Sequence, residues 1–239
     1  MTQVDVLAIA AHRDDVELTC SGTLLVAARH GHRTGVVDLT AGEMGTRGSA
    51  ELRAREAAEA AKILGLTVRE NLGLPDAAIV NSPEARALLV PVIRRLQPKV
   101  VIAPAQDGRH PDHRVTAELV RDACFLAGLA KFAPGLPPYR PRKVVHCITY
   151  REEPVKPTFI VDISDVFEEK LAAMAAYGSQ LAGVLQAGEV YPNTDELFQI
   201  VRYQAAHYGS MIRCRYGEPY YTAETMRVED ILTLEVATF

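Results

Sequence analysis

The chain has 239 residues, of which 48% are hydrophobic and 23% are charged, and these proportions are typical of a soluble globular fold and exclude a disordered chain. Its 26 basic and 30 acidic side chains give a net charge of −4 without any long basic run, which argues against nucleic acid or an anionic membrane as a partner. No apolar run approaches the roughly 18 residues that a membrane-spanning helix needs.

Short apolar runs alternate with helical patterns over the first two-thirds of the chain. Residues 4–10 form an apolar run that predicts a strand, residues 22–31 repeat apolar side chains at helical spacing, and residues 35–39 predict a second strand. Ser49 predicts the start of a long helix that runs to about residue 64, because its hydroxyl can accept a backbone hydrogen bond in the first turn.

The same alternation continues through a weaker strand at residues 67–72 and a helix that starts at Ser82-Pro83-Glu84, where a capping hydroxyl precedes proline at the first helical position. Residues 99–104 are almost continuously apolar, as in strands that are buried on both faces of a parallel sheet. Four β-α repeats with short connections predict a doubly wound, Rossmann-like α/β fold, in which a mostly parallel sheet is flanked by helices on both faces.

The last third of the chain adds predicted strands near residues 144–150 and 158–162 and helices that begin at Ser164 and Asn193. No internal repeat or low-complexity linker interrupts the chain, so we expect a single domain over residues 1–239. A run of mostly aromatic side chains near the C-terminus predicts an interface with a neighbouring subunit, since aromatic residues are enriched at interfaces; it comprises Tyr203, His207, Tyr208, Tyr216, Tyr220 and Tyr221.

The four cysteines lie far apart and form no C-x-x-C pair, so we expect neither a disulfide framework nor a cysteine-based zinc site. Buried free thiols are typical of a reducing compartment, and the first five residues lack the positive region of a signal peptide. We therefore expect a cytoplasmic protein.

Two polar motifs follow strands that become neighbours in the common strand order 3-2-1-4. Ala11-His12-Arg13-Asp14-Asp15 directly follows the first strand, and His110-Pro111-Asp112-His113 follows the loop after the fourth strand. Each motif alone is more often a turn or a helix start than a site. Ligands, however, bind outside the carboxyl ends of the strands where the chain reverses direction across the sheet. We therefore expect both motifs to build one site there.

His12, Asp15 and His113 are the predicted metal ligands. Two imidazoles and one carboxylate are a recurrent zinc set in hydrolytic sites, where the fourth position is left for water. The same set also suits iron, so the sequence predicts zinc(II), with iron(II) or another divalent metal as the alternative.

Asp14, His110 and Asp112 are the remaining acid–base side chains of the motifs. Asp14 is adjacent to two predicted ligands and is placed to accept a proton from the attacking water. Pro111 predicts a helix start, and Asp112 is predicted to hold His110 as an imidazolium that donates to a developing oxyanion. A metal, a base and an oxyanion donor together predict hydrolysis of an amide or an ester.

The two motifs resemble those of the LmbE/PIG-L family of zinc-dependent N-acetylglucosamine deacetylases. The first family motif, A-H-P-D-D, stands here as residues 11–15, the second is matched fully by residues 110–113, and the likeness extends from residue 4 to about residue 181. The likeness is greatest to the branch of bacillithiol biosynthesis, which implies cleavage of N-acetyl-glucosaminyl malate to glucosaminyl malate and acetate. The resemblance also implies the ligand, base and oxyanion roles given above, and a homo-oligomer, namely a hexamer.

Four further residues bear on substrate and activity. Arg13 replaces the proline of the family motif and is expected to add a charge beside the metal. The glycine-rich loop from Gly42 to Gly48 leaves the second strand at the same edge of the sheet, where Arg47 or Arg53 would bind a substrate carboxylate. The alternative is a surface loop followed by a solvated helix face, and the resemblance favours Arg53 because it implies an arginine against the substrate there. Tyr191 is expected in a loop over the pocket.

Other functions fit the same sequence. An amidase that cleaves mercapturic conjugates of a sugar thiol, or a deacetylase of another N-acetylglucosamine derivative, would share every motif. A non-catalytic sugar- or nucleotide-binding module would need only the sheet, but the G-x-G-x-x-G that a dinucleotide requires after the first strand is missing. For each of the enzymes the partner is a small amino-sugar conjugate.

Overall fold

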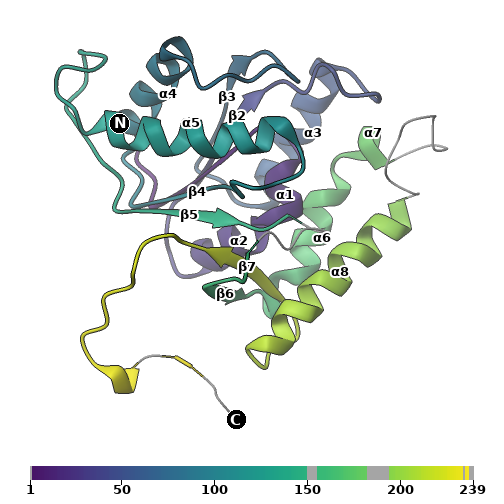
Figure 1. Cartoon of the computed structure of the whole chain (residues 1–239). Helices are drawn as coiled ribbons and strands as arrows, with labels where there is room; N and C mark the ends of the chain where they lie inside the picture. The colour runs from purple at the N-terminus through teal and green to yellow at the C-terminus, as the bar shows by residue number, and fades with distance from the viewer. Residues whose placement is uncertain (1, 150–154, 182–193, 234, 237–239) are drawn as a thin grey trace.

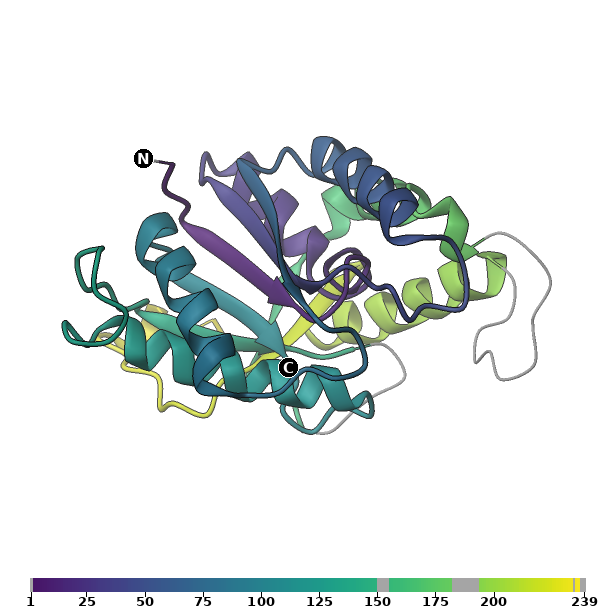
Figure 2. The same cartoon turned by 90° about the horizontal axis from the view of Figure 1, so that it is seen from above.

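Seven strands form one sheet in the order β3-β2-β1-β4-β5-β7-β6, with helices on both faces (Figures 1 and 2). The computed structural model describes residues 2–149, 155–181, 194–233 and 235–236. The strand order places the first four strands as 3-2-1-4, and each neighbouring pair among them runs parallel, as predicted. The prediction of a doubly wound α/β fold is therefore confirmed.

The elements of the first two-thirds follow the predicted alternation. In chain order they are β1 (Val6–Ala10), α1 (Asp15–Thr19), α2 (Ser21–Arg29), β2 (Thr34–Thr40), α3 (Ala50–Ile63), β3 (Val68–Leu74), α4 (Pro83–Leu96), β4 (Val100–Pro104), α5 (Pro111–Ala127) and β5 (Lys143–Cys147). The hydroxyls of Ser49 and Ser82 accept hydrogen bonds from the backbone N–H groups of Leu52 and Ala85, which confirms both predicted helix starts. The helix α1 was not predicted, because its first turn coincides with the polar motif.

The last third contains β6 (Phe159–Asp162), a 3-10 turn η1 (Ser164–Val166), α6 (Phe167–Ala175), α7 (Gly178–Leu181), α8 (Thr194–Met211), β7 (Gly217–Tyr221) and a second 3-10 turn η2 (Ile231–Thr233). The helix expected at Ser164 starts as a 3-10 turn, because Asp162 accepts from the backbone N–H and the hydroxyl of Ser164. Asn193, the other predicted start, lies outside the described residues. None of the described helices is both long and apolar enough to cross a membrane.

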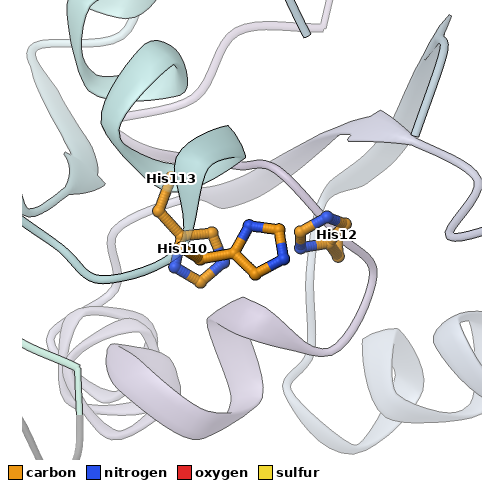
Figure 3. Close-up of side chains that lie close together, drawn as sticks. All are labelled: His12, His110 and His113. Atoms are coloured by element: carbon orange, nitrogen blue, oxygen red, sulfur yellow. The ribbon is translucent and has the colours of Figure 1, made fainter. Parts of the chain in front are cut away.

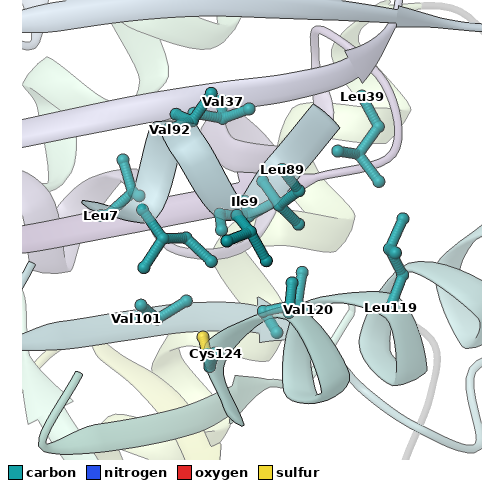
Figure 4. Packing of buried hydrophobic residues seen from close by; sticks show 14 of the residues in the cluster. Leu7, Ile9, Val37, Leu39, Leu89, Val92, Val101, Leu119, Val120 and Cys124 are labelled. Atoms are coloured by element: carbon teal, nitrogen blue, oxygen red, sulfur yellow. The ribbon is translucent and has the colours of Figure 1, made fainter. Parts of the chain in front are cut away.

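The strand β1 shows how the sheet divides the core into two layers. Leu7 and Ile9 point to one face, where they pack with α4 and α5, and Ala8 and Ala10 point to the other face, where they pack with α1 and α2. Figure 4 shows the first of these layers, in which side chains of β1, β2 and β4 meet Leu89 and other residues of the two helices. Both faces of β1 are therefore buried, which explains its almost uniformly apolar sequence.

The strand β7 enters the sheet between β5 and β6 and runs antiparallel to both. It was not predicted, because its sequence Gly-Glu-Pro-Tyr-Tyr contains a charge and a proline. The prediction that the C-terminal tyrosines form a subunit interface is wrong for four of them, which are buried within the chain itself: Tyr208, Tyr216, Tyr220 and Tyr221. Tyr203 on α8 is exposed.

Candidate active site

The carboxyl ends of β1 and β4, which pair in parallel, carry the two motifs. The first motif leaves β1 and enters α1, and the second forms the start of α5. A pocket of about 400 Å³ opens at this edge of the sheet. Its wall combines both motifs with the glycine-rich loop and the loop after β3, and it includes His12, Asp14, Asp15, Arg53, His110 and His113.

Asp15 lies between the two predicted imidazole ligands. Its Oδ2 is 3.3 Å from His12 Nδ1, and its Oδ1 is 3.1 Å from His113 Nε2. Burial by itself would raise the pKa of Asp15, but the two imidazoles outweigh it and hold the pKa well below its ordinary value. The carboxylate is therefore ionised, and the structure brings all three predicted ligands together.

These three residues fit a divalent metal ion. Although His113 Nε2 is close to Asp15, it is buried and makes no hydrogen bond with the part of the chain that the structure describes. A buried ring nitrogen without a hydrogen bond costs free energy unless something else binds it. Two imidazole nitrogens beside one carboxylate are the donor set that zinc and iron(II) accept.

The two groups in the described residues whose possible ligand atoms all lie within 4.8 Å of one another differ from the predicted set. His110 joins His12 and His113 in a cluster whose ring nitrogens lie within 4.8 Å of one another, and Figure 3 shows these three rings side by side. A second cluster with the same spacing consists of His12, Asp76 and Asp112. The donor chemistry therefore supports a metal centre at this position without fixing which metal binds.

His12 is held on its outer side by two carboxylates. Its Nε2 lies 3.1 Å from Oδ1 of Asp76 and 3.4 Å from Oδ2 of Asp112. Burial lowers the pKa of His12, but the carboxylates of Asp15 and Asp76 outweigh burial and raise the pKa to about 11. Because Nε2 donates outward, Nδ1 is the nitrogen directed toward Asp15 and the pocket.

Asp112 does not pair with His110 in the way that the sequence predicted. The carboxylate of Asp112 accepts a hydrogen bond of 2.8 Å from the backbone N–H of Ala77 and faces His12. His110 instead caps α5, because its Nδ1 accepts from the backbone N–H of Asp112 at 3.2 Å. Burial and the neighbouring imidazoles lower the pKa of His110, which favours the neutral ring with its proton on Nε2. The prediction that Asp112 holds His110 as an imidazolium is therefore wrong for this geometry.

Asp14 lies at the pocket wall and is paired with Arg53. The guanidinium Nη2 of Arg53 is 3.0 Å from Oδ1 of Asp14, and its Nη1 donates to the carbonyl of Gly42 at 2.9 Å. Gly42 has a φ of 71°, and a Cβ there would collide with the guanidinium, so the glycine is needed for this close approach. Arg53 is thus buried between Asp14 and the glycine-rich loop and lines the pocket.

Two other arginines lie elsewhere. Arg47 is not part of the pocket wall: its guanidinium donates to the carbonyl of Gln180, and its own carbonyl accepts from the Gln180 side chain. The guanidinium of Arg13 donates to the carbonyl of Ala50 at 2.6 Å, at the start of α3, and this residue does not line the pocket either. The sequence predicted that the positive charge of Arg13 lies beside the metal, but the guanidinium binds the start of α3 instead. Tyr191 lies outside the described residues.

Asp76 and Arg109 are pocket residues to which the sequence assigned no role. Asp76 follows Pro75 directly after β3, and its carboxylate accepts from the backbone N–H groups of Met44 and Ala77. Since β3 is parallel to β2, its carboxyl end lies at the same edge as the motifs. A turn aspartate directly after a parallel strand was the signal that would have identified Asp76.

Comparison with known proteins shows the family to which these motifs belong. Residues 7–124 match the family model PIG-L, described as GlcNAc-PI de-N-acetylase. Diacetylchitobiose deacetylase of Thermococcus kodakarensis is 33% identical over 230 residues, which cover 89% of this chain and 80% of that protein. The chain belongs to the PIG-L family. The family resemblance and the predicted class of hydrolase, a deacetylase, are thereby confirmed.

Two more similarities support this assignment. The 2'-N-acetylparomamine deacetylase of Streptomyces fradiae is 30% identical over 202 residues, covering 73% of this chain and 72% of that one. A conserved protein of Thermus thermophilus has a crystal structure with a TM-score of 0.84 at 36% identity, covering 95% of this PIG-L chain and 98% of its own. The similarity thus extends well beyond the two motifs.

Proposed function

We propose that this PIG-L protein is a metal-dependent N-deacetylase that hydrolyses the acetamide of an N-acetylglucosamine conjugate. The observation that carries the proposal is the contact of Asp15 with both His12 and His113 at the pocket wall, with Asp14 lining the same pocket. The relatives that deacetylate diacetylchitobiose and N-acetylparomamine support an amino-sugar substrate. We propose N-acetyl-glucosaminyl malate as the specific substrate, on the motif resemblance to the bacillithiol branch.

His12, Asp15 and His113 would hold the metal, for which we propose zinc(II), with iron(II) as the alternative. When bound, such an ion acts as a Lewis acid that polarises the acetamide carbonyl and makes water more acidic. Asp14 takes the proton of the attacking water, and Arg53 orients its carboxylate through their ion pair.

His110 donates its Nε2 proton toward the oxygen of the acetamide, on which charge develops during attack. The cap bond from the backbone N–H of Asp112 fixes this tautomer, because it occupies Nδ1. Asp112 acts indirectly, by orienting His12. The amine leaves after it receives the proton that Asp14 collected, so the proton count balances over the reaction.

The pocket also supports recognition of a charged conjugate. Arg53 and Arg109 both line it, and the positive charge of a guanidinium attracts a carboxylate even where, as in Arg53, the group also binds Asp14. Of the two arginines considered from the sequence, Arg53 is the one we propose for substrate binding, since Arg47 does not line the pocket and instead binds Gln180, which does. We further propose a cytoplasmic homo-oligomer, which the four free cysteines and the exposed apolar side chains of Met226, Ile231 and Leu232 support.

The test of this function measures acetate release from N-acetyl-glucosaminyl malate, N,N'-diacetylchitobiose and free N-acetylglucosamine, and separately the release of the mercapturic acid from a sugar-thiol conjugate. We expect the highest kcat/KM for the malate conjugate and complete loss of activity after chelation of the metal. Preference for diacetylchitobiose would replace the proposed substrate, cleavage of the thiol conjugate alone would favour the amidase, and activity that survives full removal of metal would contradict the mechanism.

Asp14→Asn tests the proposed base. The amide cannot accept the proton of the attacking water, so we expect kcat to fall by at least about 10² while the metal content stays stoichiometric. Activity close to that of the wild type would show that another group is the base. Asp122→Asn on the outer side of α5 is the matched control, since its carboxylate contacts Asn81 and Arg86 far from the motifs and should leave kcat unchanged.

A further inference from the structure

The backbone carbonyl of Arg13, in the centre of the first motif, accepts two hydrogen bonds from side chains beneath the pocket. One donor is the hydroxyl of Tyr177, which follows α6, and the other is the guanidinium of Arg69, in β3. Neither side chain lines the pocket, and neither belongs to a motif that the sequence singled out. The contacts thus connect two remote elements to the turn that carries the proposed base.

Arg69 is a rigid donor because two carboxylates fix its guanidinium. It binds Asp38 in bidentate fashion, with distances of 2.9 and 3.0 Å, and it donates to Glu17 at 2.6 Å. The side chains of all three residues are at most 8% exposed. The geometry of a buried bidentate pair leaves the guanidinium little freedom, so its remaining N–H group holds the carbonyl of Arg13 in one place.

Tyr177 is equally constrained. It is 2% exposed and packs against Ala57 and Ala60 of α3. Its hydroxyl therefore reaches the carbonyl of Arg13 from the side of α3 and α6, while Arg69 reaches the same oxygen from β3. Two donors on one oxygen, from different elements, restrict rotation of the peptide group much more than one would.

The carbonyl of Arg13 and the N–H of Asp14 belong to one planar peptide unit. Fixing the carbonyl therefore fixes the position of the Asp14 Cα, and this restricts the directions that the Asp14 carboxylate can take while Arg53 holds the carboxylate itself. The preceding part of the turn is held in the same way, since the carbonyl of Ala11 accepts from the N–H and the hydroxyl of Thr40, both at 3.0 Å. We propose that Arg69 and Tyr177 are positioning residues that aim Asp14 at the attacking water.

This inference rests on the proposed function, because it assigns the two residues to the base of that reaction. Tyr177→Phe is the decisive variant, since it removes one donor and leaves the ion pairs of Arg69 in place. Misplacement of a reacting group by about 1 Å can cost on the order of 10² in rate. We expect kcat to fall about tenfold, with KM and metal content unchanged.

Tyr139→Phe is the matched control. The Tyr139 hydroxyl also donates to a backbone carbonyl, that of Pro98, at the opposite end of β4 from the motifs. The Tyr139→Phe variant loses a similar hydrogen bond, but its kcat should stay within about twofold of the wild type. An unchanged kcat in Tyr177→Phe, or an equal loss in both variants, would overturn the proposal. Arg69→Lys keeps the charge but has a single nitrogen, which cannot bind both carboxylates and the carbonyl of Arg13 as the guanidinium does. It should therefore lower kcat in the same way.

A double-mutant cycle separates positioning from general damage to the fold. If Tyr177 acts through Asp14, then Tyr177→Phe should not reduce the residual activity of Asp14→Asn any further. A tenfold loss that persists in the Asp14→Asn background would contradict the proposal. An Asp14→Asn variant that is as active as the wild type would refute the proposed base instead, so the two failures are distinguishable.

Discussion

Asp112 illustrates how a motif residue can act on a different partner from the one its sequence neighbours indicate. The H-P-D-H spacing favoured a pairing with His110, but the helical turn directs the carboxylate to His12, which comes from the other motif. Sequence spacing predicts which residues gather at a sheet edge, because strand order fixes that. It does not predict which pairs form, since those depend on side-chain directions across elements.

We expect Asp112→Asn to weaken metal binding. Removing a carboxylate that orients a metal-ligating histidine typically costs about 10- to 100-fold in affinity. The metal affinity, measured by competition with a coloured chelator, should therefore drop by that factor, whereas Asp122→Asn on the same helix should not change it. Equal affinities in the two variants would contradict the role that the structure gives to Asp112.

The pKa of Glu17 predicts how the stability of the protein depends on pH. Burial raises the pKa of Glu17 from 4.5 to about 7, although the charge of Arg69 opposes the shift. An acid with a higher pKa in the folded than in the unfolded chain binds more protons when folded, so its contribution to stability is present at pH 4.5 and is lost as the pH rises to about 7.

The free energy of unfolding of the wild type, relative to that of Glu17→Gln, should therefore fall over this range of pH. Denaturant unfolding at several pH values measures the difference. Glu59→Gln, at an exposed position of α3, serves as the control and should follow the wild type in parallel. If the difference in free energy of unfolding between the wild type and Glu17→Gln stayed constant over this range of pH, Glu17 would not bind the proton in the folded chain.

At the scale of elements, two buried charged side chains stabilise the break between α1 and α2. The ammonium group of Lys170 in α6 donates to the carbonyls of Glu17 and Leu18 at the end of α1, and the carboxylate of Glu218 in β7 accepts from the first N–H groups of α2. The two side chains also pair with each other at 2.9 Å. Each therefore satisfies helix ends that would otherwise be buried without partners.

Lys170→Met should be strongly destabilising, because it leaves the Glu218 carboxylate buried without its cation. Removing one partner of a buried pair costs about 3–5 kcal/mol, which chemical denaturation measures directly. Lys62→Met is the control, since Lys62 pairs with Glu59 at an exposed site of α3, where a pair contributes little. Similar denaturation midpoints for the two variants would show that the buried ion pair is not needed for stability.

Periodicity and capping residues were sufficient to predict the regular elements up to β5, apart from α1. Ser49 and Ser82 marked helix starts by chemistry that acts within one turn, and the apolar run of β4 identified a strand buried on both faces. The helix α1 and the strand β7 could not be predicted in this way, because their polar side chains are satisfied by distant residues. The charge of Glu218 indicates a solvent-exposed position in the sequence, yet the residue is buried against Lys170.

At the scale of the whole molecule, β7 brings a segment from late in the chain into the interior of the sheet. It is the neighbour of both β5 and β6, so a chain that ends at Arg215 would lose the strand that joins β6 to the rest of the sheet. We expect such a chain to lose cooperative unfolding, measured by circular dichroism, whereas a chain that ends at Thr222 should retain it. A cooperative transition in the shorter chain would contradict the proposed single domain.

The interior position of β7 also has a consequence for how the protein is made. Because β7 is synthesised after both of its neighbours in the sheet, the nascent chain exposes one edge of β5 and all of β6 until residues 217–221 have left the ribosome. Unpaired strand edges attract other chains, and this one carries apolar side chains. Slow or interrupted translation of the segment between β6 and β7 should therefore favour aggregation and recruitment of chaperones.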